Sequence, residues 1–336
     1  MDKRKIMPVK KYKVVGLGHA VVDVLANIED DFLPKYDLKK GMMKIVDESE
    51  IEGLRSCVDI IKEVSGGSAA NTIAALSSLG HPVAFIGKVR DDMLGRAFEK
   101  GLEEIGVSYF TIKAASGKPT ACCVVLTTPD AHRTMNTYLG IAGFLTPEDV
   151  DEEVISQSEI IYLEGYLWDS DGAKRAFKKA IEIAGDTGGK VALGLSDSFC
   201  VERHRGEFLD LIENHVDILF ANEDEIKSLF KTDDLETAIS RCREMKNICV
   251  ITRSEKGSVI VSEDKIIKIP PEQDINVLDS TGAGDLFAAG FLHGLINGRD
   301  LEDCGKIGSI VAAEILGQFG ARPEVPLIDL VESRGY

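Results

Sequence analysis

A short motif late in the chain, residues 279–285 (Asp-Ser-Thr-Gly-Ala-Gly-Asp), combines two glycines with two carboxylates and precedes an apolar run at 286–292. The pattern predicts a tight turn and a helix that begins at about Gly284, whose first N–H groups lack partners within the helix. These groups and the helix dipole favour a bound anion, and Gly282 and Gly284 let it approach the backbone closely. Asp285 adds a carboxylate that can take a proton from an attacking hydroxyl. Amides beside a general base suit phosphoryl transfer.

A second motif with small residues lies early in the chain, at residues 65–72 (Ser-Gly-Gly-Ser-Ala-Ala-Asn-Thr), and leads into a helical pattern. Ser68 is a suitable N-cap residue for that helix. Gly66 and Gly67 have no side chains, so their backbone is exposed and can lie against a ligand. The Asn71 side chain offers both a hydrogen-bond donor and an acceptor. Each motif also has a purely structural explanation. The late one could be an acidic helix start after a glycine-rich turn, and the early one a tight turn before a packed helix.

Together the two motifs resemble the paired signatures of the ribokinase-like (PfkB) carbohydrate kinase family. Residues 66–71 match the first signature and residues 279–285 the second, in the family's order and separation. The resemblance runs from Val14 to about Pro326, and the adenosine-kinase-like branch is the most similar. It implies an enzyme that uses ATP and Mg²⁺ to phosphorylate a small-molecule alcohol, with Asp285 as the general base.

The resemblance also implies roles for three sets of residues. The catalytic set is Asp285, Gly282, Ala283, Gly284 and Arg133. The acceptor-binding set is Asp23, His19, Gly66, Gly67, Ser68 and Asn71. The nucleotide-binding set is Asn222, Thr252, Gly257 and Thr281. Chemistry agrees for Asp23, because a carboxylate can accept hydrogen bonds from two neighbouring hydroxyls. On local grounds Asp23 and Arg133 could equally be solvated loop residues.

Two cation sites follow from the same resemblance. Asn222 and Glu225 match the family's Asn-x-x-Glu motif, which positions Mg²⁺ near the nucleotide phosphates, largely through water. Mg²⁺ keeps several waters, so two indirect contacts are sufficient. The local alternative is an acidic helix N-terminus favoured by the dipole. Some family members also need K⁺ beside the anion turn, and Asp279 and Thr281 are the candidate ligands, although the sequence does not decide whether K⁺ is required.

Strands and helices must alternate to position these residues. Short apolar runs predict strands at 14–17, 83–86, 160–163, 191–195, 216–220 and 249–252. Helical patterns occupy 93–105, 171–184, 203–214, 285–297 and 301–316, and 258–269 alternates like a hairpin. This order predicts an α/β fold with a doubly wound, mostly parallel central sheet flanked by helices. We expect a single catalytic domain over 1–336, with a core at about 12–23, 49–110 and 139–336.

Two stretches, about 24–48 and 111–138, interrupt the alternation and contain extended pieces with no long helix between them. They could be surface hairpins. The resemblance instead implies a small β-sheet lid over the acceptor site. A lid suits phosphoryl transfer because water must be kept from the transferable group.

Composition narrows the class of partner. The 336 residues carry a formal net charge of −17, which disfavours nucleic acid and anionic membranes. No apolar run approaches the length of a membrane span. Seven scattered cysteines without a CxxC pair predict buried thiols in a reducing cytoplasm. The protein is expected to be a monomer or a homodimer, since an exposed lid edge could pair with a second copy.

The predicted reaction is transfer of the γ-phosphoryl group of ATP to a primary hydroxyl of a nucleoside. Adenosine, giving AMP, ranks ahead of a simple sugar such as ribose, fructose or a keto-deoxy sugar acid. His19 stands where the branch often has Asn, and an imidazole can make similar hydrogen bonds. Two other classes are a non-catalytic ligand sensor on the same fold and a dinucleotide-binding protein. The latter rests on Gly16-Leu17-Gly18, but Val21 replaces the third glycine.

Overall fold

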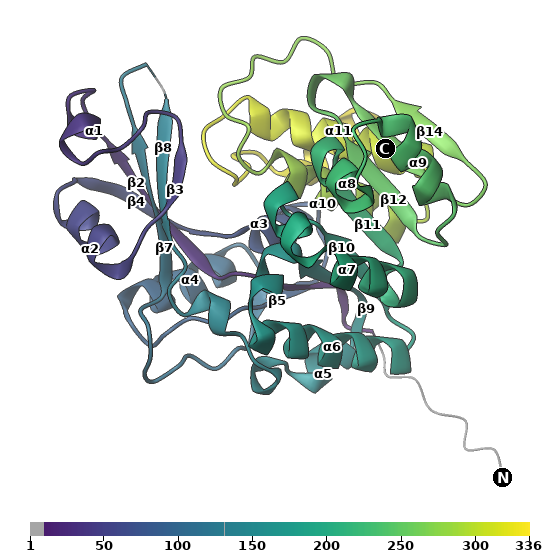
Figure 1. The fold of residues 1–336 in the computed structure, drawn as a ribbon, viewed down its shortest axis with the longest axis horizontal. Coiled ribbons are helices and arrows are strands. Elements are labelled where there is room, and N and C mark those ends of the chain that lie inside the picture. Colours follow the sequence, from purple (N-terminus) through teal and green to yellow (C-terminus); the bar gives the residue numbers. More distant parts are fainter. Residues whose placement is uncertain (1–9, 131) are drawn as a thin grey trace.

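The structure is a computed structural model that describes residues 10–130 and 132–336, and within them it contains a large and a small β-sheet (Figure 1). The large sheet has the order β14-β13-β12-β11-β10-β9-β1-β5-β6. Its strands are β1 (Tyr12–Leu17), β5 (Val83–Ile86), β6 (Ser108–Tyr109), β9 (Ser158–Glu164), β10 (Lys190–Gly194), β11 (Ile218–Asn222), β12 (Ile248–Thr252), β13 (Ser258–Val261) and β14 (Ile266–Ile269). Pairing is parallel from β6 to β12, and only the hairpin β13–β14 adds antiparallel contacts. The expected doubly wound, mostly parallel sheet is therefore confirmed.

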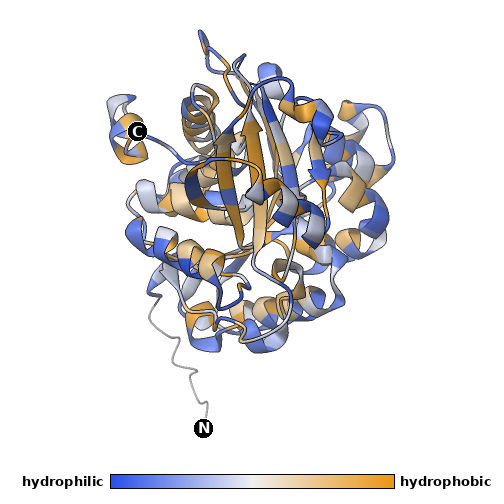
Figure 2. Cartoon of the chain, turned by 90° about the vertical axis from the view of Figure 1, so that its left-hand side faces the viewer, coloured by the Kyte–Doolittle hydropathy of each residue, from blue (hydrophilic) through white to orange (hydrophobic). Residues whose placement is uncertain are grey.

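Helices cover both faces of the large sheet, because its strands bury alternate side chains in two separate cores. In β9, for example, Ile160 belongs to one core and Ile161 to the other. One core is closed by α3 (Ser68–Ser78), α4 (Met93–Glu104), α10 (Ala283–Ile296), α11 (Leu301–Leu316) and α12 (Leu327–Ser333). The other is closed by α5 (Glu152–Ser156), α6 (Asp171–Asp186), α7 (Ser198–His215), α8 (Glu223–Phe230) and α9 (Leu235–Arg243). Figure 2 shows the apolar strands inside and the polar faces of the helices outside.

Several expected elements are found with small shifts of their ends. The helix over 301–316 and the strand over 83–86 are confirmed at both ends, and the hairpin turns through Ser262 and Lys265. The chain is already helical from Ser198, where the Asp197 side chain accepts a hydrogen bond from the Cys200 amide (2.6 Å), and a kink at His204 separates this first part from the rest of the helix expected over 203–214.

The small sheet stands to one side of the large one and has the order β3-β8-β7-β2-β4 (Figure 1). Its strands are β2 (Val21–Asn27), β3 (Met43–Ile45), β4 (Ile60–Gly66), β7 (Ala121–Thr127) and β8 (Arg133–Tyr138). The short helix α1 (Phe32–Lys35) and the helix α2 (Glu48–Ser56) belong to the same stretch of chain. The expected boundaries need correction, because β2 begins before residue 24 and β4 lies in the stretch 49–110 that was assigned to the core. Asp23 consequently lies inside a strand, opposite Val64, and not in a loop.

The expectations about the domain, membrane spans and cysteines can be compared with the described residues. Residues 1–9 and 131 of the expected single domain lie outside the described residues. Within the rest, none of the helices is long and apolar enough to cross a membrane. The cysteines carry free thiols, six of them buried as expected and Cys57 exposed.

Candidate active site

The predicted anion turn and the candidate base, Asp285, lie together at the start of α10. This helix begins at Ala283, one residue earlier than expected, and its N-cap Gly282 has a φ of 81°. A Cβ at Gly282 would lie 2.5 Å from the Cβ of Ala321, so only glycine fits there, whereas the space beside Gly284 is open. Among the described residues, no acceptor pairs with the backbone N–H groups of Gly282, Gly284 and Asp285. These amides are free for an anion.

Asp285 lines a cavity of about 850 Å³ at the carboxyl ends of β9 to β12. Its carboxylate accepts hydrogen bonds from Ser68 Oγ (2.6 Å) and Asn71 Nδ2 (3.0 Å), and Thr72 Oγ1 donates to its backbone carbonyl (3.1 Å). Residues of the early motif therefore hold the Asp285 carboxylate of the late motif by hydrogen bonds. Ser68 was expected to be the N-cap of α3, but the N-cap is Gly67, and the hydroxyl of Ser68 serves Asp285 instead.

The charge state of Asp285 is set by opposing effects. Burial raises the pKa of this carboxyl group to about 7, and the charge of Glu164 adds to the rise. The hydrogen bonds from Ser68 and Asn71 and the charge of Arg322 lower it. A carboxylate with a pKa near neutrality can both take and release a proton, as a general base must.

The two glycines of the early motif are required by close approaches. A Cβ at Gly66 would lie 2.6 Å from Oδ2 of Asp23, and a Cβ at Gly67 would lie 2.2 Å from the backbone oxygen of His19. Gly67 also has a φ of 106°, which L-residues rarely adopt. The structure thus brings together four of the residues predicted to bind the acceptor. Burial raises the pKa of Asp23 to about 6, against the lowering effect of two arginine charges.

Glu164 is a site residue that the sequence interpretation missed. Its side chain is 2% exposed and lies at the carboxyl end of β9. One carboxylate oxygen contacts His19 Nδ1 (2.6 Å) and the His19 amide (3.2 Å), and the other accepts from the Ala69 amide (2.9 Å). The rule that ligands gather at the carboxyl ends of parallel strands could have found it, because it directly follows the run 160–163.

Asn222 and Glu225 form a capping box at the start of α8. The carboxylate of Glu225 accepts from the Asn222 amide (2.9 Å) and from Asn222 Nδ2 (2.7 Å), and Asn222 Oδ1 accepts from the Glu225 amide (2.8 Å). Both residues line the cavity, and burial raises the pKa of Glu225 to about 7. A pair that is already hydrogen-bonded internally fits Mg²⁺ held through water. In the described part of the chain, no group of three His, Cys, Asp or Glu side chains could bind a metal directly.

Asp279 is hydrogen-bonded and ion-paired within the protein. One of its oxygens accepts from the Thr281 amide (3.0 Å) and hydroxyl (2.7 Å). The other accepts from the Gly320 amide (2.9 Å) and forms an ion pair with Arg133. Both oxygens therefore have partners within the protein, and the expectation that Asp279 and Thr281 hold K⁺ stays a prediction. Arg133, expected over the phosphoryl group, instead pairs with the anion turn.

The remaining nucleotide-binding candidates divide between the cavity wall and the turn. Thr252 and Gly257 line the cavity, and Gly257 has a φ of 78° that L-residues rarely adopt. Thr281 is not among the lining residues, because its hydroxyl faces Asp279. Apolar side chains that the sequence interpretation did not name complete the wall, among them Phe220, Val250, Ile275, Phe287 and Leu316.

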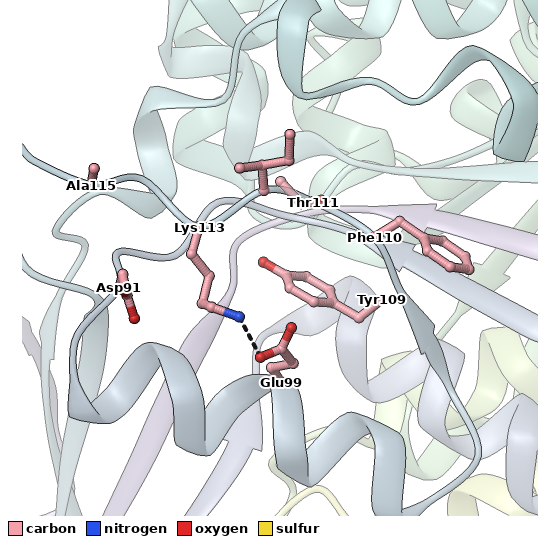
Figure 3. A pocket seen from close by; sticks show the side chains of 8 residues that line it. Asp91, Glu99, Tyr109, Phe110, Thr111, Lys113 and Ala115 are labelled. Atoms are coloured by element: carbon pink, nitrogen blue, oxygen red, sulfur yellow. Dashed lines mark hydrogen bonds and ion pairs between the residues drawn. The ribbon is translucent and has the colours of Figure 1, made fainter.

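A second cavity of about 370 Å³ lies at β6 and the segment that follows it (Figure 3). Lys113 crosses it to pair with Glu99 of α4 (2.5 Å). None of the residues named above as site candidates lines this cavity. The motifs therefore belong to the larger cavity.

Comparisons with known proteins are consistent with this geometry. A family model described as "pfkB family carbohydrate kinase" matches residues 31–327. The structure of adenosine kinase from Sinorhizobium meliloti is 42% identical with a TM-score of 0.88, over 97% of this chain and 100% of that one. A probable sugar kinase protein from Rhizobium etli is 41% identical with a TM-score of 0.89, over 97% and 99%. An uncharacterized sugar kinase from Archaeoglobus fulgidus is 31% identical, over 75% of this chain and 98% of its own length.

Proposed function

The chain belongs to the pfkB family of carbohydrate kinases, phosphotransferases that act on hydroxyl groups of sugars and nucleosides, and we propose that its own acceptor is a nucleoside, adenosine. The proposal that the protein is a kinase depends mainly on the surroundings of Asp285. This carboxylate lies beside three amides that have no partner in the described part of the chain, and it is held by Ser68 and Asn71. The S. meliloti adenosine kinase supports the acceptor.

In the proposed reaction, a primary hydroxyl of the acceptor gives its proton to Asp285 while its oxygen attacks the γ-phosphorus of ATP in line, and ADP leaves. The amides of Gly282, Gly284 and Asp285 stabilise the developing charge, supported by the dipole of α10. Mg²⁺, held through water by Asn222 and Glu225, would neutralise phosphate charge.

Acceptor binding is assigned to Asp23, His19 and the Gly66–Gly67 turn. Asp23 accepts hydrogen bonds from sugar hydroxyls. Asn71 supports this assignment, because its Nδ2 donates to Asp285 while its Oδ1 is buried with no partner among the described residues. A ligand hydroxyl can supply the missing donor.

Arg133 has an indirect role in this proposal. Its ion pair with Asp279 cancels a negative charge at the anion turn, where a bare carboxylate would repel the phosphates. ATP would lie in the large cavity with Thr252 and Gly257 at its edge.

The test is a comparison of acceptors under one set of conditions, with ATP and Mg²⁺. We expect kcat/KM for adenosine to exceed that for ribose, fructose and a keto-deoxy sugar acid by about 100-fold or more, because a site built for a base leaves polar groups unpaired with a bare sugar.

A simple sugar is the second candidate, favoured by the R. etli protein of nearly the same similarity. Rapid sugar turnover without adenosine turnover would establish it. Adenosine that binds while no ADP forms would instead identify a ligand sensor.

A further inference from the structure

The loop between α11 and α12 contacts both motifs of the active site. Its Gly320 amide donates to Asp279 (2.9 Å), and Ala321 packs so closely on Gly282 that no Cβ fits between them. The next residue, Arg322, extends in the other direction to the early motif. One short segment therefore connects two turns that are distant in sequence.

The guanidinium of Arg322 spans the glycine turn. Its Nε (2.8 Å) and Nη2 (2.5 Å) donate to the backbone oxygen of Ser65, and its Nη1 donates to that of Ala70 (2.9 Å). Ser65 precedes the Gly66–Gly67 pair and Ala70 follows it. This planar, forked group holds both ends of the turn in a way that a lysine cannot reproduce.

The same guanidinium brings a positive charge to two carboxylates. Its charge lowers the pKa of Asp23 in the small sheet and that of Asp285 in α10, against the burial that raises both. Burial also lowers the pKa of Arg322, to about 10, so the group stays charged throughout the neutral range.

The surroundings of Asp285 are otherwise acidic or neutral. Glu164 and Tyr162 face it from β9, Glu225 from α8 and Tyr166 from the turn after β9. Asp23 faces Arg133 of β8 and Cys123 of β7 as well as Arg322.

We propose that Arg322 is a positioning residue of this kinase, which clamps the glycine turn through the carbonyl groups of Ser65 and Ala70 and brings a positive charge to Asp23 and Asp285. This inference rests on the kinase function proposed above. It extends that function by linking acceptor binding and the base through one side chain that touches neither reacting group.

The experiment separates the charge of Arg322 from its shape. Arg322→Gln removes the charge, Arg322→Lys keeps it but loses the fork, and Arg241→Gln is the matched control on exposed helix surface, where Arg241 pairs with Glu244. For each variant, kcat and the acceptor KM are measured across the neutral pH range, with circular dichroism to confirm folding.

In Arg322→Gln we expect the acid limb of the plot of kcat against pH to move up by about one pH unit. Losing an opposite charge raises the pKa of a carboxyl group by about that much. Its kcat falls about tenfold at pH 6.5 and recovers on the alkaline side. In Arg322→Lys the limb stays at the wild-type position while the acceptor KM rises, and the control matches wild type.

The proposal is overturned if the acid limb of the kcat profile lies at the same pH in all variants. It is also overturned if the limb moves equally in the Lys and Gln variants. If Arg322→Gln does not fold, the Lys variant decides, because a limb shifted despite the retained charge contradicts the inference.

A wild-type enzyme that forms no ADP refutes the proposed function but not this inference. In that case ¹³C NMR titration of Asp285, assigned with Asp285→Asn, tests it without turnover. The carboxyl pKa must be higher in Arg322→Gln than in the wild type, and an unchanged value overturns the proposal.

Discussion

At the scale of single residues, the site is a group of carboxyl groups whose surroundings oppose ionisation. Asp23, Glu225 and Asp285 all have a pKa raised by burial, and buried Glu164 accepts hydrogen bonds from the His19 and Ala69 amides and contacts the His19 ring. Keeping such groups costs stability, and they gather where chemistry needs them.

Replacing Asp285 by Asn tests the base directly. We expect kcat to fall about 10²- to 10⁴-fold, because the amide cannot accept the proton, while the affinity for the acceptor stays near that of the wild type. Steady-state kinetics and calorimetric binding measure the two effects. Asp171→Asn, an exposed acidic residue in the first turn of α6, is the control and keeps full activity. Near-normal turnover in Asp285→Asn would exclude this residue as the base.

The pH dependence of the wild type follows from the same carboxyl group. Since the pKa of Asp285 is about 7, the ionised base predominates only above that pH. We expect kcat to fall about tenfold for each pH unit below the limb, and to level off above it. A profile flat down to pH 5 would show that no group with this pKa takes part in turnover.

Stability should respond to pH in the opposite direction. A carboxyl whose pKa is raised from 3.8 to about 7 in the folded protein favours folding at low pH, and this contribution is lost as pH rises from about 4 to about 7. Asp285→Asn should therefore be more stable than the wild type at pH 8, by on the order of 2 kcal/mol, with a smaller difference at pH 5. Urea unfolding at both pH values measures this, and an equal difference at the two would contradict it.

At the scale of elements, the site depends on how closely α3 and the β1–β2 connection approach each other. Gly67→Ala places a Cβ 2.2 Å from the backbone oxygen of His19 and forces an unfavourable φ. We expect it to cost about 2 to 4 kcal/mol of folding free energy and to raise the acceptor KM.

The control for that change is Gly53→Ala in the middle of α2, where a Cβ meets nothing within 4 Å. This substitution should be neutral or stabilising by up to about 1 kcal/mol, because alanine favours helix. Chemical denaturation compares the two variants, and equal stability would show that the glycine turn tolerates a side chain.

At the scale of the whole molecule, the small sheet is tied to the large one at the anion turn by the ion pair between Arg133 of β8 and Asp279. Both side chains are only about a tenth exposed, 10% and 11%. Such a pair is costly to break from one side, because the remaining charge is left without its partner.

Arg133→Met should therefore loosen the small sheet. We expect amide hydrogen exchange in β8 to become about tenfold faster or more, with little change in α10. Lys40→Met removes ion pairs with Asp30 and Asp130 in the connections between the strands of the small sheet and serves as the control. Unchanged exchange in Arg133→Met would mean that other contacts hold the small sheet in place.

The sequence alone predicted the strands of the large sheet except the short β6, because strands buried on both faces and helices with one apolar face leave periodic signals in a short window. It failed for β4, which pairs antiparallel with β2 across a long separation in the chain. The resemblance carried the site residues from the two motifs, and the structure brings most of them to one place. Nothing in the sequence indicated the role of Arg322, because its partners are backbone oxygens of a turn that is remote in the chain.

By itself, then, the sequence determined the two motifs, the sheet and the type of chemistry, since these depend on residue type and local spacing. Only the tertiary structure decided the pairing of each polar group. It gave Ser68 to Asp285 rather than to its own helix end, Arg133 to Asp279, and His19 to Glu164. The hydrogen-bond partners and the burial of a side chain depend on distances between segments far apart in the chain. Partners and burial in turn shift the pKa values of the buried carboxyl groups.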